Sequence, residues 1–326
     1  MRLIARLVTA GDSLCFVGTA GVGKSNLINF LREYPVYIRE YFGADADKLH
    51  FPFVDTNQWD RTPEGLGNLI LDALDAAGIT PPPTKDGAII PLSQEDRAFA
   101  KVRNRLRKAC QDFQHHVVIV LDDFDRALEV GPLGMLEQLN GLRSDGNKGY
   151  LSYLVFTKRL PHILGRALNL ETSSKFYDLL RHNLYTLEPC VPTDARQIVE
   201  HLNLTSTTRV SNQDLARICA LAGGHAGLLK NIFRVCVEQG LPSGNDTPGQ
   251  LVGYQDVRVE CRRIVDGLHE QEQEVALLVA KGQYTSADTD TVAHLIKRGI
   301  LLEAEPLQWF SPVFASYLRD GTSEKG

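Results

Sequence analysis

Short apolar runs alternate with segments of helical periodicity through the first half of the chain. Each run is apolar at successive positions and bounded by turn residues, which predicts a buried strand. The segments between the runs place apolar residues three or four positions apart, as an amphipathic helix does. The predicted strands are Leu14–Val17, His50–Val54, Val117–Leu121 and Leu151–Phe156, and the predicted helices are 2–10, 25–32, 66–77, 94–113 and 135–142. A proline-rich loop is predicted at 80–91, and a helix capping box at Ser93–Asp96.

Buried strands that alternate with helices predict an α/β fold, in which helices cover both faces of a parallel sheet. Near residue 188 the pattern changes to helices alone, and the turn-rich segment Gly240–Gln250 is predicted to be a linker. Beyond the linker, three helices followed by a hairpin give the order of a winged helix. The elements predicted after residue 188 are helices at 194–203, 211–221, 226–238, 256–267, 270–280 and 288–298, strands at 300–303 and 308–310, and a helix at 312–319.

The composition excludes several classes of protein. Of the 326 residues, 43% are hydrophobic, which is too many for a disordered chain, and the 27 Gly and 15 Pro show no fibrous period. A net charge of −5 gives no global argument for binding nucleic acid or an acidic membrane. The longest aliphatic run, Val117–Leu121, is far shorter than the roughly 20 residues of a membrane span. The N-terminus does not resemble a signal peptide, because Arg6 interrupts its apolar run, so we expect a cytoplasmic protein.

The six cysteines are too widely spaced for metal or redox chemistry. They occupy positions 15, 110, 190, 219, 236 and 261, and no two form a CxxC pair. Several have apolar neighbours, which is typical of buried, reduced thiols.

Gly18-Thr19-Ala20-Gly21-Val22-Gly23-Lys24-Ser25 has the form of a phosphate-binding loop, and Asn26 follows it. Glycines let the backbone curl so that successive N–H groups face phosphate oxygens, and the N-terminus of the next helix adds positive charge. Lys24 is predicted to reach the β- and γ-phosphates, and the Ser25 hydroxyl to ligate Mg²⁺. A predicted strand enters the loop and a predicted helix leaves it, as this motif requires.

Two further strand ends carry candidate chemistry. Asp122 and Asp123 follow the strand at 117–121, and parallel strands deliver their C-terminal residues to a ligand crevice. Asp122 is predicted to hold Mg²⁺ and Asp123 to orient or deprotonate the attacking water. Arg159 follows the strand at 151–156 and is predicted to contact the γ-phosphate. The alternatives are an ordinary Asp pair in a turn and a solvated basic turn.

These elements, in this order, resemble the STAND class of P-loop NTPases, which is AAA+-related and includes NB-ARC proteins and archaeal and origin-recognition ATPases. Leu187-Glu188-Pro189 and Ser311-Pro312-Val313-Phe314 also resemble segments of that class. The resemblance implies a P-loop NTPase core at 1–188, a helical lid at 189–240, a linker at 241–250 and a winged-helix domain at 251–320. It also implies an ATP/ADP switch with slow hydrolysis, in which the winged helix closes on the ADP state and a protein partner or a second copy of the chain binds the ATP state.

The chain departs from this class at the lid. The class often carries a Gly-x-Pro turn that touches the nucleotide, and Ala226 stands where that proline is expected. His225, beside it, is a candidate nucleotide contact, and the alternative is a surface histidine. The class usually has residues upstream of the first helix that cradle the adenine, and this chain begins almost at that helix, so we expect either weak adenine selectivity or a wrong start site. The choice of adenine over guanine rests on the resemblance alone.

The sequence leaves an alternative function open: a DNA-binding AAA+-like ATPase of replication-initiator or transposition-helper type. Six cations lie in the helix predicted at 94–113, where a solvated face is the simpler interpretation. Three arginines occupy the helix at 256–267. The predicted recognition helix carries Asp288 and Asp290 against Lys297 and Arg298, and the hairpin Glu303-Ala304-Glu305 is acidic, which disfavours DNA. We therefore rank the nucleotide-dependent signalling or regulatory switch first.

Overall fold

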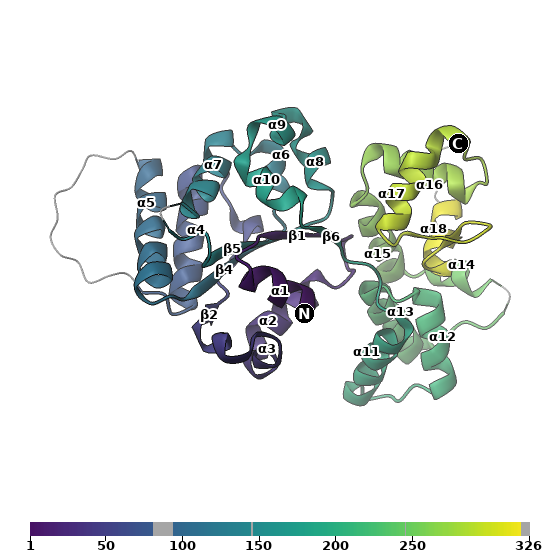
Figure 1. Ribbon diagram of the computed structural model, residues 1–326. Helices are drawn as coiled ribbons and strands as arrows, with labels where there is room; N and C mark the ends of the chain where they lie inside the picture. The colour runs from purple at the N-terminus through teal and green to yellow at the C-terminus, as the bar shows by residue number, and fades with distance from the viewer. Residues whose placement is uncertain (81–93, 145, 245, 321–326) are drawn as a thin grey trace. The chain divides into compact units, whose positions relative to one another are not determined.

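In a computed structural model, the chain divides into two compact units (Figure 1). The first unit contains Met1–Val17 and Asn26–Tyr185, and the second contains Gly18–Ser25 and Thr186–Gly326. The structure describes residues 1–80, 94–144, 146–244 and 246–320. Most of the predicted loop at 80–91, and Ser93 of the predicted capping box, lie outside these residues. No helix among the described residues combines the length and apolarity of a membrane span.

The first unit is built on a six-stranded sheet with the order β2-β4-β5-β1-β6, and β3 also pairs with β4. The strand pairs β1–β5, β2–β4, β3–β4 and β4–β5 are parallel. Val17 at the end of β1 pairs with Thr157 at the end of β5, and Leu121 of β4 pairs with Val155. The C-terminal ends of β1, β4 and β5 therefore share one edge of the sheet. The strands are β1 (Leu14–Val17), β2 (Leu49–His50), β3 (Phe53–Asp55), β4 (His116–Asp122), β5 (Leu151–Thr157) and β6 (Leu184–Thr186).

Helices cover both faces of this sheet, as predicted (Figure 1). Alternate residues of β1, β4 and β5 join the core formed with α4, α5, α7 and α10, while α1, α2 and α3 cover the opposite face. The helices of the first half are α1 (Arg2–Thr9), α2 (Lys24–Glu33), α3 (Pro35–Phe42), α4 (Pro63–Ala76), α5 (Gln94–Arg107), α6 (Asp125–Val130), α7 (Leu133–Leu142), α8 (Pro161–Leu164), α9 (Leu170–Ser173) and α10 (Lys175–Arg181). Short 3₁₀ segments are η1 (Gly43–Lys48), η2 (Thr56–Gln58) and η4 (Gly165–Leu168), and a π turn, η3 (Lys108–Asp112), ends α5.

The predicted strand at 50–54 is two strands, because Pro52 interrupts it. Proline has no N–H to donate, and its carbonyl accepts a 2.8 Å bond from the Val120 N–H instead. The sequence analysis did not predict α3, α6, α8, α9, α10 and β6, which have eight residues or fewer, and the shortest of them show no period. Helix α4 begins earlier than predicted, since Thr62 caps it by accepting the Gly65 N–H and Pro63 occupies its first turn.

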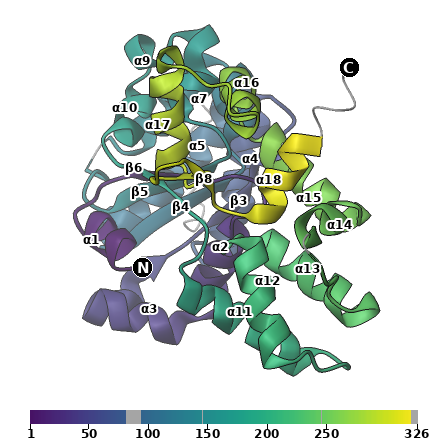
Figure 2. The same cartoon turned by 90° about the vertical axis from the view of Figure 1, so that its right-hand side faces the viewer.

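The second unit is helical with one short hairpin. Its helices α11, α12 and α13 lie side by side (Figure 2), and one hydrophobic core runs from Ala195 to Leu318. The elements are α11 (Pro192–Thr205), α12 (Asn212–Ala222), α13 (Ala226–Gln239), α14 (Thr247–Val252), α15 (Gln255–Asp266), α16 (Glu270–Ala280), η5 (Ser286–Asp288), α17 (Thr289–Lys297), β7 (Leu301–Leu302), β8 (Gln308–Trp309) and α18 (Pro312–Asp320). The helices and the hairpin follow the predicted order.

The predicted linker at 241–250 is only partly a linker, because α14 begins inside it. The Asp246 side chain caps this helix by accepting the Gly249 N–H at 3.2 Å, and Pro248 lies in its first turn. Aspartate followed by proline marks a helix start as well as a turn, so composition alone could not separate the two.

Arg298, one of the charges counted on the predicted recognition helix, is buried. Its guanidinium forms an ion pair with Glu272 of α16, and both side chains are almost fully buried, at 2% and 3% exposed. The same Glu272 carboxylate accepts the His269 N–H at 2.8 Å, and Arg298 also donates to the Gly267 carbonyl at 3.1 Å. These contacts join α16, the residues before it and the end of α17.

We predict that Glu272→Gln lowers the free energy of unfolding by about 3–5 kcal/mol, because it leaves the Arg298 charge buried and unpaired. Denaturant unfolding measures the change. Glu270→Gln, an exposed neighbour on the same helix, should change stability by less than about 0.5 kcal/mol. Equal effects of the two substitutions would contradict the buried pair.

Candidate nucleotide site

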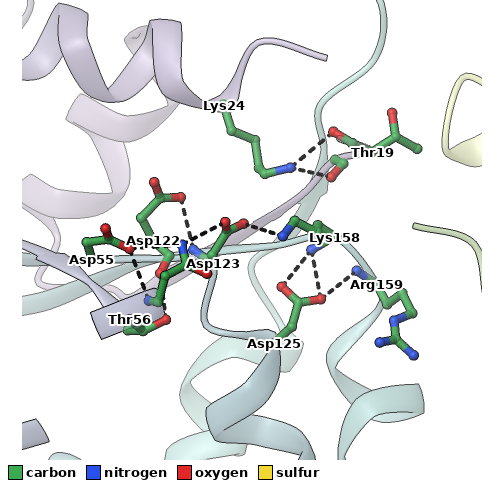
Figure 3. Close-up of polar contacts among 11 residues, drawn as sticks. Thr19, Lys24, Asp55, Thr56, Asp122, Asp123, Asp125, Lys158 and Arg159 are labelled. Carbon is green, nitrogen blue, oxygen red and sulfur yellow. Dashed lines mark hydrogen bonds and ion pairs between the residues drawn. The ribbon is translucent and has the colours of Figure 1, made fainter. Parts of the chain in front are cut away.

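The predicted phosphate loop follows directly from β1, which ends at Val17, and leads into α2, which begins at Lys24. Gly21 and Gly23 have positive φ angles of 74° and 125°, conformations that other residues rarely adopt. Such a backbone turns successive N–H groups toward one point, which is how a loop holds phosphate. The Lys24 ammonium donates to the carbonyls of Gly18 at 2.6 Å and Thr19 at 3.0 Å (Figure 3).

The two aspartates at the end of β4 have different surroundings. Asp122 accepts the Asp123 N–H at 2.9 Å, and its own carbonyl accepts the Thr56 hydroxyl at 2.7 Å. Asp123 lies outside the strand with a φ of 51°, a left-handed conformation that Asp tolerates better than most residues. Its carboxylate accepts Asn57 Nδ2 at 3.1 Å and pairs with Lys158 Nζ at 3.2 Å. The side chain of Asp123 is therefore held from two sides.

The turn after β5 is organised by Asp125, the first residue of α6. Its carboxylate accepts the backbone N–H groups of Lys158, at 3.0 and 2.9 Å, and of Arg159, at 3.1 Å (Figure 3). Burial raises the pKa of Asp125, and these two backbone bonds oppose the rise. The sequence analysis gave Asp125 no role in the site. The one available signal was that an acidic residue at this position favours the start of a helix.

The structure separates the two basic residues of this turn. The Arg159 guanidinium pairs with Glu129 of α6 at 3.1 Å and points away from Asp123 (Figure 3). Lys158, which the sequence analysis passed over, contacts Asp123 instead. Neighbouring residues on a turn point in different directions, so a sequence pattern does not reveal which one faces the aspartate. The γ-phosphate contact of Arg159 stays a prediction, and it requires release from Glu129.

His225 is not on the surface: it is 1% exposed and contacts the phosphate loop. Its Nε2–H donates to the Ala20 carbonyl at 2.9 Å, and its Nδ1 accepts the Leu228 N–H at 3.3 Å. These two partners fit one neutral tautomer. Burial, with smaller effects from Lys24 and Arg263, lowers the pKa of His225 to about 4. His225 thus fastens the start of α13 to the loop as an uncharged ring.

The predicted site residues form two groups in the structure. In the first unit, the shared sheet edge brings together Asp122, Asp123 and the turn that carries Arg159. In the second unit, the loop Gly18–Ser25 lies with His225, and Gly21 accepts a 2.9 Å bond from the Gly227 N–H. Asn26 is exposed on α2. Within the described parts of the chain, no cluster of three or more His, Cys, Asp or Glu residues could hold a metal by itself.

The chain matches no protein-family model and no curated protein sequence. It is similar in structure to the Walker-type ATPase PABY2304 of Pyrococcus abyssi, with a TM-score of 0.63 and 15% identity over 98% of this chain and 93% of that one. It is also similar to the Aeropyrum pernix ORC2 protein. The ADPNP–ADP complexes of ORC2 give a TM-score of 0.55 and 12% identity, covering 98% of this chain and 92% of that one. The ADP form gives a TM-score of 0.53 and 12% identity, covering 99% and 91%. The chain therefore shares the fold of these proteins, and the prediction of a parallel sheet with helices on both faces, followed by a helical C-terminal part, is confirmed.

We predict that stability depends on pH through His225. Its folded pKa of about 4 lies below the ordinary 6.5, so its stabilising contribution is complete above pH 6.5 and is lost as the pH falls toward 4. A difference of about 2.5 pKa units corresponds to about 3 kcal/mol at most. Unfolding titrations between pH 4 and 7 should show this loss in the wild type and not in His225→Gln. Identical pH profiles would contradict the buried neutral ring.

Proposed function

We propose that the chain is an AAA+-type ATPase that binds and hydrolyses Mg-ATP and works on DNA, like a replication initiator or a transposition helper. The observation that carries the ATPase proposal is the glycine-rich loop between β1 and α2, in a parallel sheet whose strand β4 ends in two aspartates. The curvature at Gly21 and Gly23 supports phosphate binding, and the fold supports an ATPase.

In this proposal the loop N–H groups of Gly18–Ser25 bind the phosphates and Lys24 exchanges its two carbonyl contacts for phosphate oxygens. The Ser25 hydroxyl and the Asp122 carboxylate would hold Mg²⁺, because they are the hard oxygen donors that this ion prefers. Bound Mg²⁺ would neutralise developing phosphate charge. Asn26 and His225 are the remaining residues that we propose for nucleotide binding. His225 would contribute by fixing the loop through its hydrogen bond to the Ala20 carbonyl.

Asp123 would orient the attacking water and accept its proton. The Lys158 ammonium pairs with the Asp123 carboxylate at 3.2 Å, which fixes the direction of the carboxylate. Arg159 would bind the γ-phosphate after leaving Glu129, since a phosphate offers the guanidinium more charge than one carboxylate. Glu129 would then hold Arg159 whenever that phosphate is missing.

The solvent-facing side of α5 supports DNA as the partner. Between Arg97 and Gln111 the chain holds six cations and no acid. Arg105 is engaged with Asp75 at 2.6 Å, while Lys101, Arg103 and Arg107 are exposed. We call these three residues the α5 cations. Exposed cations concentrated on one helix fit the phosphate backbone of nucleic acid, even on a chain whose net charge is −5.

The signalling switch implied by the STAND resemblance has weaker support than the DNA-associated ATPase. The structural likenesses reported above are to a Walker-type ATPase and to an origin-recognition protein, and none is to a STAND protein. The DNA-associated function therefore takes first place here. A protein partner, or a second copy of the chain in the ATP state, remains part of the proposal with either function.

We predict that Lys24→Ala abolishes binding of ATP and ADP, measured by calorimetry and by identifying nucleotide released from the purified chain.

We also predict that Asp123→Asn keeps ATP bound and slows hydrolysis by about a hundredfold or more. Lys175→Ala and Asp72→Asn, which change exposed residues elsewhere in the first unit, are the controls and should behave as wild type. Undiminished binding by Lys24→Ala would refute the phosphate loop.

We predict that reversing the α5 cations, with Lys101→Glu, Arg103→Glu and Arg107→Glu together, weakens duplex DNA binding. The slope of log Kobs against log salt should become shallower by about two to three, because three phosphate contacts are lost. Reversal of the exposed Arg166, Arg209 and Lys230 gives the same net charge and is the control. Equal weakening by both sets would mean that net charge, rather than the α5 face, governs binding.

A further inference from the structure

A carboxylate of α15 is buried against the phosphate loop. Glu260 is 4% exposed, and its Oε2 accepts a 3.0 Å bond from Arg263, one turn further along the helix. Among the described residues, its Oε1 has no hydrogen-bond partner. A buried acceptor without a donor is destabilising, so the position of this oxygen needs a reason.

Two glycines make room for this oxygen. A Cβ added to Gly21 of the loop would lie 1.7 Å from Oε1, and one added to Gly227 of α13 would lie 2.0 Å from it. Gly227 also donates its N–H to the Gly21 carbonyl at 2.9 Å. The loop, α13 and α15 therefore meet at a notch between Gly21 and Gly227, and the Glu260 carboxylate fills it.

The charge of Glu260 opposes the charge that the loop is built to bind. Phosphates held by the loop N–H groups would add negative charge within a few ångströms of a carboxylate that water does not screen. Arg263 offsets part of the Glu260 charge, but its side chain is 57% exposed and makes one bond to the carboxylate. Glu260 and Arg263 together therefore favour the loop without bound phosphate over the loop with bound phosphate.

We infer that Glu260 is an affinity-setting residue: it lowers the affinity of the loop for nucleotide phosphates, and nucleotide binding in turn weakens the contact of α15 with the loop. The inference rests on the proposed nucleotide function and adds a regulation of the same site. Binding and contact are linked reciprocally, so whatever loosens α15 from the loop strengthens nucleotide binding by the same factor. Arg263 acts in the opposite direction to Glu260, because it offsets part of the carboxylate charge.

The test is ADP binding to the full chain, measured by calorimetry at low salt. Glu260→Gln keeps the shape and removes the charge, and it should lower the Kd by about tenfold or more. Arg263→Gln should raise the Kd. Glu270→Gln and Arg262→Gln remove the same charges from exposed positions nearby and should leave the Kd within about twofold of the wild-type value.

A wild-type chain that binds ADP, with a Glu260→Gln variant of equal or weaker affinity, overturns this inference and leaves the proposed function standing. A wild-type chain and a Glu260→Gln variant that both fail to bind ADP overturn the two together. Binding by the variant alone supports both.

The notch itself can be tested without nucleotide. Gly227→Ala should lower the thermal midpoint in the wild-type background, because its methyl group collides with the carboxylate, and should lower it much less in a Glu260→Ala background. Equal losses in the two backgrounds would show that the carboxylate does not occupy the notch, and would overturn the inference. A smaller loss in the second background supports it even where Glu260→Gln has folded poorly.

Discussion

Parallel pairing of β4 and β1 with the strand between them, β5, is the constraint on which the candidate site depends. Because all three strands run in one direction, each delivers its C-terminal residue to the same edge of the sheet. The phosphate loop leaves β1 there, the aspartates leave β4 there, and the turn of Lys158 and Arg159 leaves β5 there. A strand reversed anywhere in this set would carry its polar residues to the opposite edge.

Much of the fold could be predicted from the sequence, because its long elements have clear apolar patterns. Strands β1, β4 and β5 and the helices α12 and α13 are where the pattern indicated. Short elements such as α8 and α9 could not be predicted, since four residues show no period. The phosphate loop and the aspartate pair could be predicted because their chemistry requires fixed residue types in a fixed order.

The parts of the site that the sequence did not reveal depend on direction and on partners. Arg159 and Lys158 are adjacent and both basic, yet one pairs with Glu129 and the other with Asp123. The burial of Arg298 could not be predicted, because its partner Glu272 lies beside it only in the folded chain. Glu260 gave no signal, because its significance comes from two glycines that are distant in the sequence. Such pairings are fixed by packing, which a single sequence does not display.

Helix α6 is attached to the turn after β5 at both of its ends, and the two attachments differ in kind. At its start, Asp125 holds backbone N–H groups, which cannot turn away. Near its end, Glu129 pairs with the side chain of Arg159, which is about one third exposed. Release of the second attachment leaves the first intact, and Ala127 and Leu128 of α6 stay buried in the core between them. A ligand that captures Arg159 would therefore free a surface carboxylate while the helix that carries it stays in place.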